Sequence, residues 1–198
     1  MSVSRETSSR LQAYAELLRH WNSRINLVAP GSLSELQTRH IDDCLQVADL
    51  IQDGTGHWVD LGSGGGLPGL VLAIAKADTD ISFTLVESDQ RKAAFLRTVV
   101  RELDLTRVKV VSRRVETLPP LNAAHVSARA LAPLRQLMAY LHLHLAPTGT
   151  AFLMKGRQWQ GEVEDARTEW VFDCVAHPSR TQEGAAILEV SGVSHGAQ

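Results

Sequence analysis

Residues 60–69 have the sequence DLGSGGGLPG, a glycine-rich turn that follows one apolar stretch and precedes another. Because glycine carries no Cβ, a ligand can approach the backbone of this turn closely. Pro68 suits the first turn of a helix, so we expect a helix at residues 67–76 and a strand at residues 57–61. Four glycines within five positions exceed what helix packing requires. The turn therefore predicts a ligand-binding strand–turn–helix unit.

The pattern after this turn alternates between short apolar strands and helices. We expect further strands at residues 81–87, 108–111, 124–127 and 150–154, and helices at residues 89–103 and 134–145. Residues 170–176 and 185–190 also have strand character, and no helix fits between them. The pattern predicts a Rossmann-like α/β fold, in which a doubly wound, mostly parallel seven-stranded sheet ends in a C-terminal antiparallel hairpin at the sheet edge.

The N-terminal part differs from this core because it contains only helical patterns. Apolar residues spaced by three and four predict an amphipathic helix at residues 5–21. A second helix is expected from a capping box at residues 32–35 towards Leu50. The chain has 198 residues, of which 44% are hydrophobic, and this size predicts one domain over residues 1–198. It divides into a helical extension at 1–52 and an α/β core at 53–198, with a disordered tail from Ser194.

Composition and charge limit the classes of function. The net charge of −2 and the isoelectric point near 6.4 give no global basic field that would point to nucleic acid. Cys44 and Cys174 lie far apart in the sequence, which argues against a disulfide framework or a zinc site. His40 has too few neighbouring ligands for a metal, so we expect no metal and a partly exposed helix histidine. No signal-peptide core or run of about 18 apolar residues occurs, which predicts a cytoplasmic protein without a membrane partner.

Two classes of nucleoside cofactor fit the turn. Glu87, at the end of the next strand, is in a position to reach the hydroxyls of a ribose, and residues 64–69 match the dinucleotide fingerprint G-x-G-x-x-G. Pro68, however, removes an N–H group that a pyrophosphate needs. The Asp60 carboxylate would repel a pyrophosphate but suits the positive charges of S-adenosylmethionine. These residues favour S-adenosylmethionine, while a dinucleotide and a purely structural turn remain alternatives.

Beyond the turn, short motifs occur in order along nearly the whole chain. They are NSRINL at 22–27, RHIDD at 39–43, ES at 87–88, RVE at 114–116, SARALA at 127–132 and KG at 155–156. Together with the turn, they resemble the bacterial ribosomal RNA small subunit methyltransferase G family, also called glucose-inhibited division protein B. The resemblance implies an S-adenosylmethionine-dependent methyltransferase that modifies N7 of a guanine in the 530 loop of 16S rRNA, as free rRNA or within the small ribosomal subunit.

The expected cofactor-binding residues come from the turn and from the ends of the strands that follow it. They are Gly62, Gly64, Gly66, Leu67, Glu87, Val115, Glu116 and Arg129. Gly64, Gly66 and Glu87 follow from the geometry of a glycine-rich turn and its ribose partner. The resemblance implies the others. Arg129 has two alternative roles: it orients the methyl donor, or it donates a hydrogen bond to O6 of the guanine.

No catalytic acid or base is expected, since guanine N7 carries a lone pair and no proton at neutral pH. The rate enhancement is expected to come from positioning. The RNA-binding candidates are Arg39, His40, Arg113, Lys155 and Arg157. Eight basic residues lie between Arg91 and Arg114 against only Glu102 and Asp104, a cluster suited to phosphate contacts.

Two other functions share this turn. A methyltransferase that acts on a small molecule or a protein needs the same cofactor site but not the basic cluster. An NAD-binding oxidoreductase requires that the G-x-G-x-x-G match at residues 64–69 binds a dinucleotide. The expected oligomeric state is a monomer.

Overall fold

The computed structural model of the protein describes residues 3–51 and 54–196, which contain one seven-stranded sheet. Its strands are β1 (Thr55–Leu61), β2 (Asp80–Val86), β3 (Val108–Val111), β4 (Ala123–Arg129), β5 (Leu145–Lys155), β6 (Trp170–Pro178) and β7 (Ala186–His195). Their order is β3-β2-β1-β4-β5-β7-β6, and β1 to β5 pair in parallel. The predicted fold class, with its mostly parallel sheet, is confirmed.

Strands β6 and β7 form the predicted antiparallel hairpin, and β7 also pairs antiparallel with β5. This arrangement makes β6 the edge strand. β7 continues to His195, whose ring stacks on Trp170 with the centroids 3.9 Å apart. The predicted disordered tail is therefore wrong for Ser194 and His195, because both residues pair with β6. Residues 197–198 of that tail lie outside the described residues.

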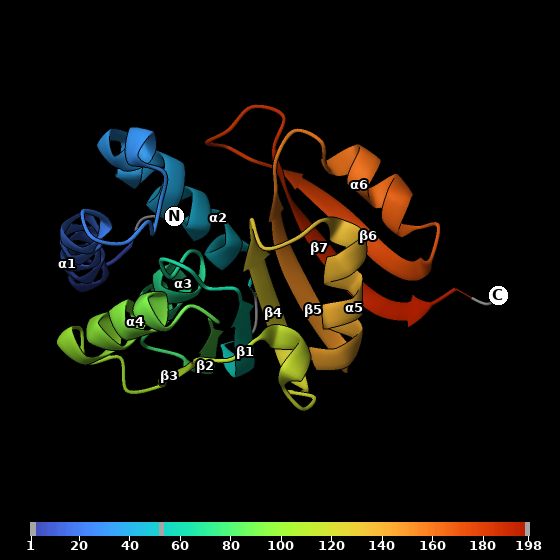
Figure 1. Cartoon of the computed structure of the whole chain (residues 1–198), viewed down its shortest axis with the longest axis horizontal. Coiled ribbons are helices and arrows are strands. Elements are labelled where there is room, and N and C mark those ends of the chain that lie inside the picture. The colour runs from blue at the N-terminus through green and yellow to red at the C-terminus, as the bar shows by residue number, and fades with distance from the viewer. Residues whose placement is uncertain (1–2, 52–53, 197–198) are drawn as a thin grey trace.

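Six α-helices in the described residues cover the two faces of the sheet (Figure 1). They are α1 (Arg5–Asn22), α2 (Asp42–Leu50), α3 (Gly69–Ala75), α4 (Gln90–Glu102), α5 (Leu134–His144) and α6 (Trp159–Ala166). Helices α1 to α4 lie on one side of the sheet and α5 with α6 on the other, as in a doubly wound fold. Helix α6 was not predicted, because its eight residues are too few to show a repeating apolar pattern. In residues 3–51 and 54–196, no helix is long and apolar enough to cross a membrane.

Side chains of the central strands alternate between these two layers. Trp58 belongs to the core on the α1–α4 side, where its ring stacks on Phe83 and Phe152 at centroid distances of 6.0 and 5.6 Å. The next residue, Val59, belongs to the core on the other face, with Leu137 of α5. Burial of both faces leaves the carboxyl ends of the parallel strands as the edge where a ligand can bind.

The second predicted helix is divided into three pieces. A 3₁₀-helix (η1, Pro30–Glu35) and a π-helix (η2, Gln37–Ile41) precede α2. The predicted capping box is wrong, because the hydroxyl of Ser32 is buried, donates to the carbonyl of Ala29 at 2.8 Å and contacts His40 at 2.7 Å. These contacts turn Ser32 inward, away from the helix N–H groups. The expected boundary between extension and core, at residues 52 and 53, lies outside the described residues.

Candidate cofactor-binding site

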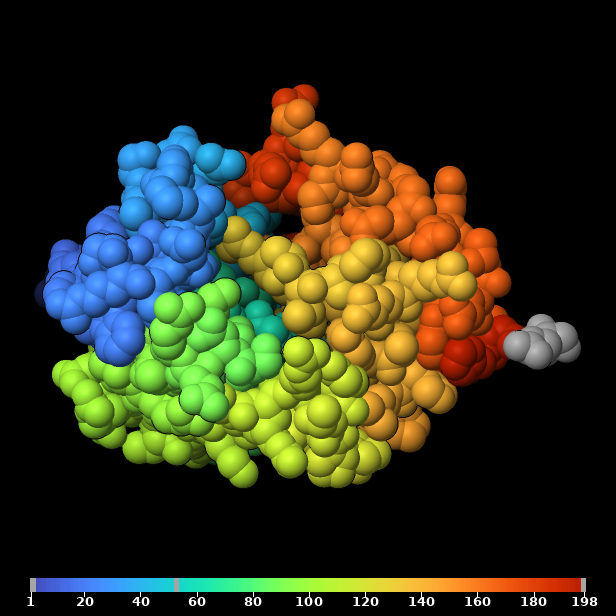
Figure 2. Space-filling model, viewed as in Figure 1, coloured from blue at the N-terminus to red at the C-terminus, as the bar shows by residue number. Residues whose placement is uncertain are grey.

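A cavity of about 660 Å³ lies where β1, β2, β3 and β4 end. Figure 2 shows the teal region of the turn recessed between the blue, green and yellow segments. Seven of the predicted cofactor residues line this cavity: Gly62, Gly64, Leu67, Glu87, Val115, Glu116 and Arg129. Gly66 is not among the lining residues, because it faces α3, where a Cβ atom would lie 2.4 Å from Leu70 Cδ1. The strand order thus brings together residues that are far apart in the sequence.

The backbone of the turn has a conformation that requires glycine at Gly62, where φ is +67°. A Cβ atom there would also lie 2.5 Å from Leu131 Cδ1, inside the cavity wall. The N-terminal extension holds the turn from behind, because the hydroxyl of Tyr14 on α1 donates to the carbonyl of Gly65 at 2.6 Å. The turn is therefore anchored to the N-terminal extension.

Glu87 is fixed by the backbone at both carboxylate oxygens. Its Oε2 accepts from the N–H of Gly64 at 2.8 Å, and its Oε1 accepts from the N–H of Asp89 at 2.7 Å. The residue is only 7% exposed, but it lines the cavity. Each carboxylate oxygen has further lone pairs, so Glu87 can still accept hydrogen bonds from a ligand.

The position of Asp60 corrects one prediction. Its carboxylate does not line the cavity; it is buried, where it accepts from Ser127 Oγ at 2.6 Å and from the N–H of Gly69 at 3.3 Å. Burial raises the pKa of this carboxyl to about 6, against the lowering effect of the Ser127 hydrogen bond. The expectation that Asp60 faces a positively charged ligand is wrong, because the residue caps α3 from inside the protein.

The same contact supports the exclusion of a pyrophosphate. Pro68 is the N-cap of α3 and has no N–H, and the N–H of Gly69 is occupied by Asp60. The N–H of Leu70 donates to the carbonyl of Gly66 at 2.8 Å. The start of α3 therefore lacks one N–H group at Pro68 and has those of Gly69 and Leu70 already occupied, which makes it a poor site for the phosphate that dinucleotide-binding folds hold there.

Arg129 is held at the cavity by the N-terminal extension. Its Nη2 donates to His40 Nδ1 at 2.6 Å, and its Nη1 points at the sulfur of Cys44 at 3.7 Å. Because a guanidinium only donates, Nδ1 of His40 must be the acceptor, and its Nε2–H then donates to Ser32. Burial, with Arg129 next in effect, lowers the pKa of His40 to about 4, so the ring is neutral at neutral pH. His40 is only 8% exposed, so the expectation of a partly exposed histidine is wrong.

The predicted RNA-binding residues are dispersed. Arg113 is exposed at the rim of the cavity. Arg39 is exposed but pairs with Glu35 at 3.1 Å and does not line the cavity. Arg157 is exposed and donates to the carbonyl of Glu183. Their contacts with RNA stay predictions.

Lys155 is less available than the sequence suggested. Its side chain is 10% exposed, and its ammonium contacts Glu162 Oε2 at 2.5 Å and the carbonyl of Ala132 at 3.1 Å. The positive charge of Lys155 is thus neutralised by an ion pair within the protein. We therefore leave Lys155 out of the RNA contacts proposed below, and its role in RNA binding stays a prediction.

The basic cluster is partly neutralised by ion pairs. Four of its members have carboxylate partners within 4.0 Å: Arg91, Arg101, Arg107 and Arg114. Lys92 and Arg113 have no such partner among the described residues, and both line the cavity. Within the basic cluster, the unpaired positive charge at the cavity is therefore carried by Lys92 and Arg113, which is less than the sequence count suggests.

Sequence reasoning missed several residues that shape the cavity. Asn22 ends α1, and its side-chain oxygen accepts from the N–H groups of Leu27 and Val28, both at 2.9 Å. This contact folds residues 27–29 over the cavity, which they line. Tyr14 lies within the amphipathic helix predicted at residues 5–21, and its hydroxyl indicates that it needs a polar partner when buried. In the described residues, no group of three or more His, Cys, Asp or Glu side chains could hold a metal ion.

The chain matches proteins of known family along nearly its whole length. The family model for rRNA small subunit methyltransferase G matches residues 7–187. The ribosomal RNA small subunit methyltransferase G of Paracoccus denitrificans is 55% identical over 98% of this chain and 100% of that protein. The protein of the same name from Gluconobacter oxydans is 46% identical over 96% of both chains.

Solved structures share the fold at low sequence identity. A SAM-dependent methyltransferase from Aquifex aeolicus superposes with a TM-score of 0.61 at 13% identity, covering 89% of this chain and 97% of that one. TYW2 of M. jannaschii, solved with AdoMet, superposes with a TM-score of 0.58 at 12% identity, covering 85% and 77%. These solved structures show only the fold, whereas the family model and the relatives at 46–55% identity also show the family. The chain belongs to the ribosomal RNA small subunit methyltransferase G family, whose members use S-adenosylmethionine.

Proposed function

We propose that the protein transfers a methyl group from S-adenosylmethionine to N7 of a guanine in the 530 loop of 16S rRNA, acting in the cytoplasm as a monomeric single domain over residues 1–198. The observation that carries the proposal is the cavity of about 660 Å³ at the carboxyl edge of the sheet in a chain of this family. The cavity has a glycine floor, a fixed carboxylate and a fixed guanidinium.

The residues of the cavity suit S-adenosylmethionine, which supplies a methyl group activated by a sulfonium. The turn at Gly62 and Gly64 lets a ligand lie against the backbone, where a side chain would intrude. Glu87 has free lone pairs for the hydroxyls of a ribose. Val115 and Glu116 line the same cavity beyond β3. A cofactor without phosphate loses nothing from the occupied N-terminus of α3.

The chemistry asked of the protein is positioning. Guanine N7 attacks with a lone pair in the plane of the ring, the N–C bond forms as the S–C bond breaks, and the purine gains the positive charge that leaves the sulfur. Since no proton moves, no general base is needed. Correct alignment of two reactants is worth up to roughly 7–11 kcal/mol in favourable cases. Arg129, held by His40, fixes one side of the reacting position.

Contacts to the rRNA backbone are assigned to the basic rim of the cavity. Lys92 and Arg113 lie there without carboxylate partners among the described residues, and cations of this kind bind phosphates with a strong dependence on salt. The rim would hold the RNA while the target base enters the site. Enzymes that modify a base commonly take it out of the stack in this way.

The test is methyl transfer from labelled S-adenosylmethionine to small subunits and to free 16S rRNA from a strain that lacks the enzyme, with the modified base mapped by mass spectrometry. We expect one 7-methylguanine in the 530 loop. Arg113→Glu should lower this activity at least tenfold at saturating S-adenosylmethionine, through a higher KM for the rRNA. Arg19→Glu makes the same charge change at an exposed position on α1 that does not line the cavity, and it is the control. Labelling of a small molecule or a protein, with rRNA untouched, would contradict the proposal.

A further inference from the structure

A second cavity, of about 270 Å³, continues the first along the same edge of the sheet. Arg129 and Ala130 line both cavities. Beyond them, the second cavity reaches the end of β5, the residues before β7, and Asp43 at the start of α2. Figure 2 shows the surface hollowed between the blue extension, the yellow segment after β4 and the red segment before β7. A group bound there would lie next to a ligand in the first cavity.

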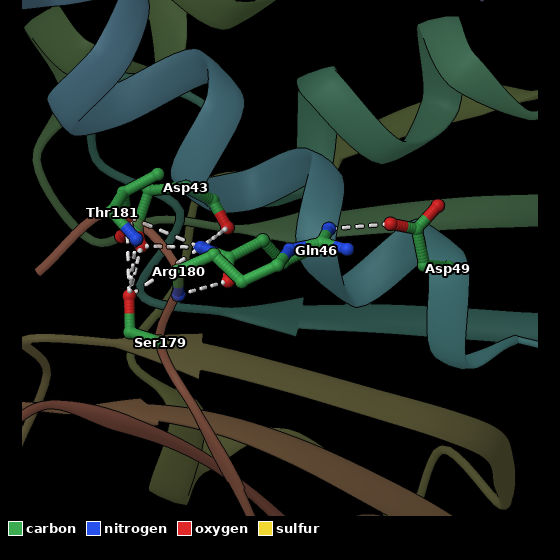
Figure 3. A network of polar contacts seen from close by, with 6 residues as sticks. All are labelled: Asp43, Gln46, Asp49, Ser179, Arg180 and Thr181. Atoms are coloured by element: carbon green, nitrogen blue, oxygen red, sulfur yellow. Dashed lines mark hydrogen bonds and ion pairs between the residues drawn. The ribbon is translucent and has the colours of Figure 1, made fainter. Parts of the chain in front are cut away.

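Asp43 is fixed in this cavity by a network that joins α2 to the loop between β6 and β7 (Figure 3). Its Oδ1 accepts from Thr181 Oγ1 at 2.5 Å, from Gln46 Nε2 at 3.0 Å and from Ser179 Oγ at 3.2 Å. Three donors hold one carboxylate oxygen. In the part of the chain that the structure describes, no donor is hydrogen-bonded to the other oxygen, Oδ2. The residue is 9% exposed and lines the cavity, so an unused acceptor is held at a defined place.

The second carboxylate of the cavity is less suited to a ligand. Glu162 pairs with Lys155 at 2.5 Å and accepts from the N–H of Leu134 at 2.8 Å. That carboxylate and the ammonium satisfy each other. Of the two carboxylates that line this cavity, Glu162 therefore has an ion-pair partner and Asp43 has none among the described residues.

The positions of N7 and N2 on the guanine ring indicate which part of the base would face each cavity. N7 must face the methyl donor, so the bidentate contact of arginine with O6 and N7, common in DNA recognition, would block the reaction. Arg129 is free to donate to O6 alone. The exocyclic amine at N2 lies at the opposite end of the purine from N7 and needs an acceptor there. A carboxylate oxygen is an acceptor only, so it matches an amine and rejects a lone pair.

We propose that the second cavity holds the guanine to be methylated and that Asp43 Oδ2 accepts a hydrogen bond from its N2 amine, with Arg129 at the O6 side. This inference rests on the proposed function. It assigns the recognition of guanine to the N-terminal extension, on the side of Arg129 remote from the turn. The polar network that holds Asp43 then serves to position the acceptor for the base.

The test replaces the target guanosine with inosine in 16S rRNA assembled by ligation and reconstituted into small subunits. Inosine lacks the N2 amine and keeps N7 and O6. A site built to bond a substrate group rejects the analogue that lacks it. For the wild-type protein we expect kcat/KM to be about ten- to a hundredfold lower on inosine, the range for an unpaired charged hydrogen bond. Asp43→Asn should lower kcat/KM on guanine by a similar factor and remove most of the difference between the two bases.

Asp49→Asn is the matched control, because Asp49 belongs to the same network through Arg180 at 2.5 Å but does not line the cavity. If Asp43 acted only by fastening the loop, Asp49→Asn would reduce the discrimination in the same way; we expect it to retain the full preference for guanine. An equal rate of the wild-type protein on both bases, or an unchanged inosine defect in Asp43→Asn, would overturn the inference. Absence of any rRNA methylation by wild-type protein that binds S-adenosylmethionine would instead refute the proposed function and the inference with it.

Discussion

Asp60 makes the stability of this protein depend on pH in a direction opposite to that of most carboxylates. Burial raises its pKa from 3.8 to about 6 in the folded chain. Between these values the folded state keeps a proton that the unfolded state has lost, so the free energy of unfolding falls as pH rises. One pKa unit corresponds to about 1.4 kcal/mol, and the loss from this residue amounts to about 3 kcal/mol, reached once the pH is above 6.

The perturbation is Asp60→Asn, which removes the titration and keeps the shape. The amide oxygen can accept from Gly69, but the NH₂ group then faces Ser127 Oγ, which already accepts from Trp58 Nε1 at 2.9 Å. The variant therefore starts with a stability offset of its own. The informative quantity is the change in the difference between variant and wild type with pH.

We would measure urea unfolding from pH 4 to pH 7.5 for wild type, Asp60→Asn and Asp78→Asn. Asp78 is exposed and serves as the control for losing one carboxylate. The free energy of unfolding of Asp60→Asn should gain about 2.4 kcal/mol relative to wild type across this range, because only the wild type loses the contribution of the protonated carboxyl and the unfolded carboxyl is already partly ionised at pH 4. The free energy of unfolding of the control, Asp78→Asn, should change little relative to wild type across the same range. Parallel curves for wild type and Asp60→Asn would refute the argument, since they would mean that Asp60 titrates alike in both states.

Three further predictions test the turn, the carboxylate and the rim. Gly69→Ala places a Cβ 2.5 Å from Leu85 Cδ2 and should lower the free energy of unfolding by about 1–3 kcal/mol, whereas Gly161→Ala in α6, with open space around it, should raise it by about 0.5–1 kcal/mol. Glu87→Gln leaves one of two backbone N–H groups without an acceptor and should weaken S-adenosylmethionine binding about tenfold in calorimetry; equal affinity would contradict this. Arg113→Ala should reduce the slope of log affinity for rRNA against log salt by about 1, and an unchanged slope would exclude a phosphate contact.

The core of the fold could be predicted because its signals are local. Buried parallel strands are short continuous apolar runs, and the glycine-rich turn fixes where β1 ends and α3 begins. The helix at Trp159–Ala166 carries no comparable signal, since it has only eight residues and is stabilised by packing on α5. The break in the second helix likewise depends on the contact of Ser32 with His40, which no local pattern reveals.

The site could be predicted only in part, for a related reason. Residues at strand ends are brought to one edge by topology, so Glu87 and Arg129 could be assigned to a common cavity. Asp60 also ends a strand, but its contact with Ser127 is made 67 residues away and turns the carboxylate into the interior. Position along a strand predicts the edge at which a residue lies. It does not predict whether the side chain faces the ligand or the core.

Two distant contacts explain why the turn specifies the cofactor and not the acceptor. Tyr14 reaches Gly65 across 51 residues, and Asp43 reaches Thr181 across 138, so the N-terminal extension is fastened at the floor of the first cavity and at the wall of the second. The first cavity is built mainly from the ends of β1 to β4, and residues 27–29 and His40 of the extension complete it. The second depends on α2 and on the loop before β7. Under the proposed assignment of the two cavities, a methyltransferase with the same core but a different extension would recognise another acceptor, because Arg129 is the point where the two cavities meet and its partner His40 belongs to the extension.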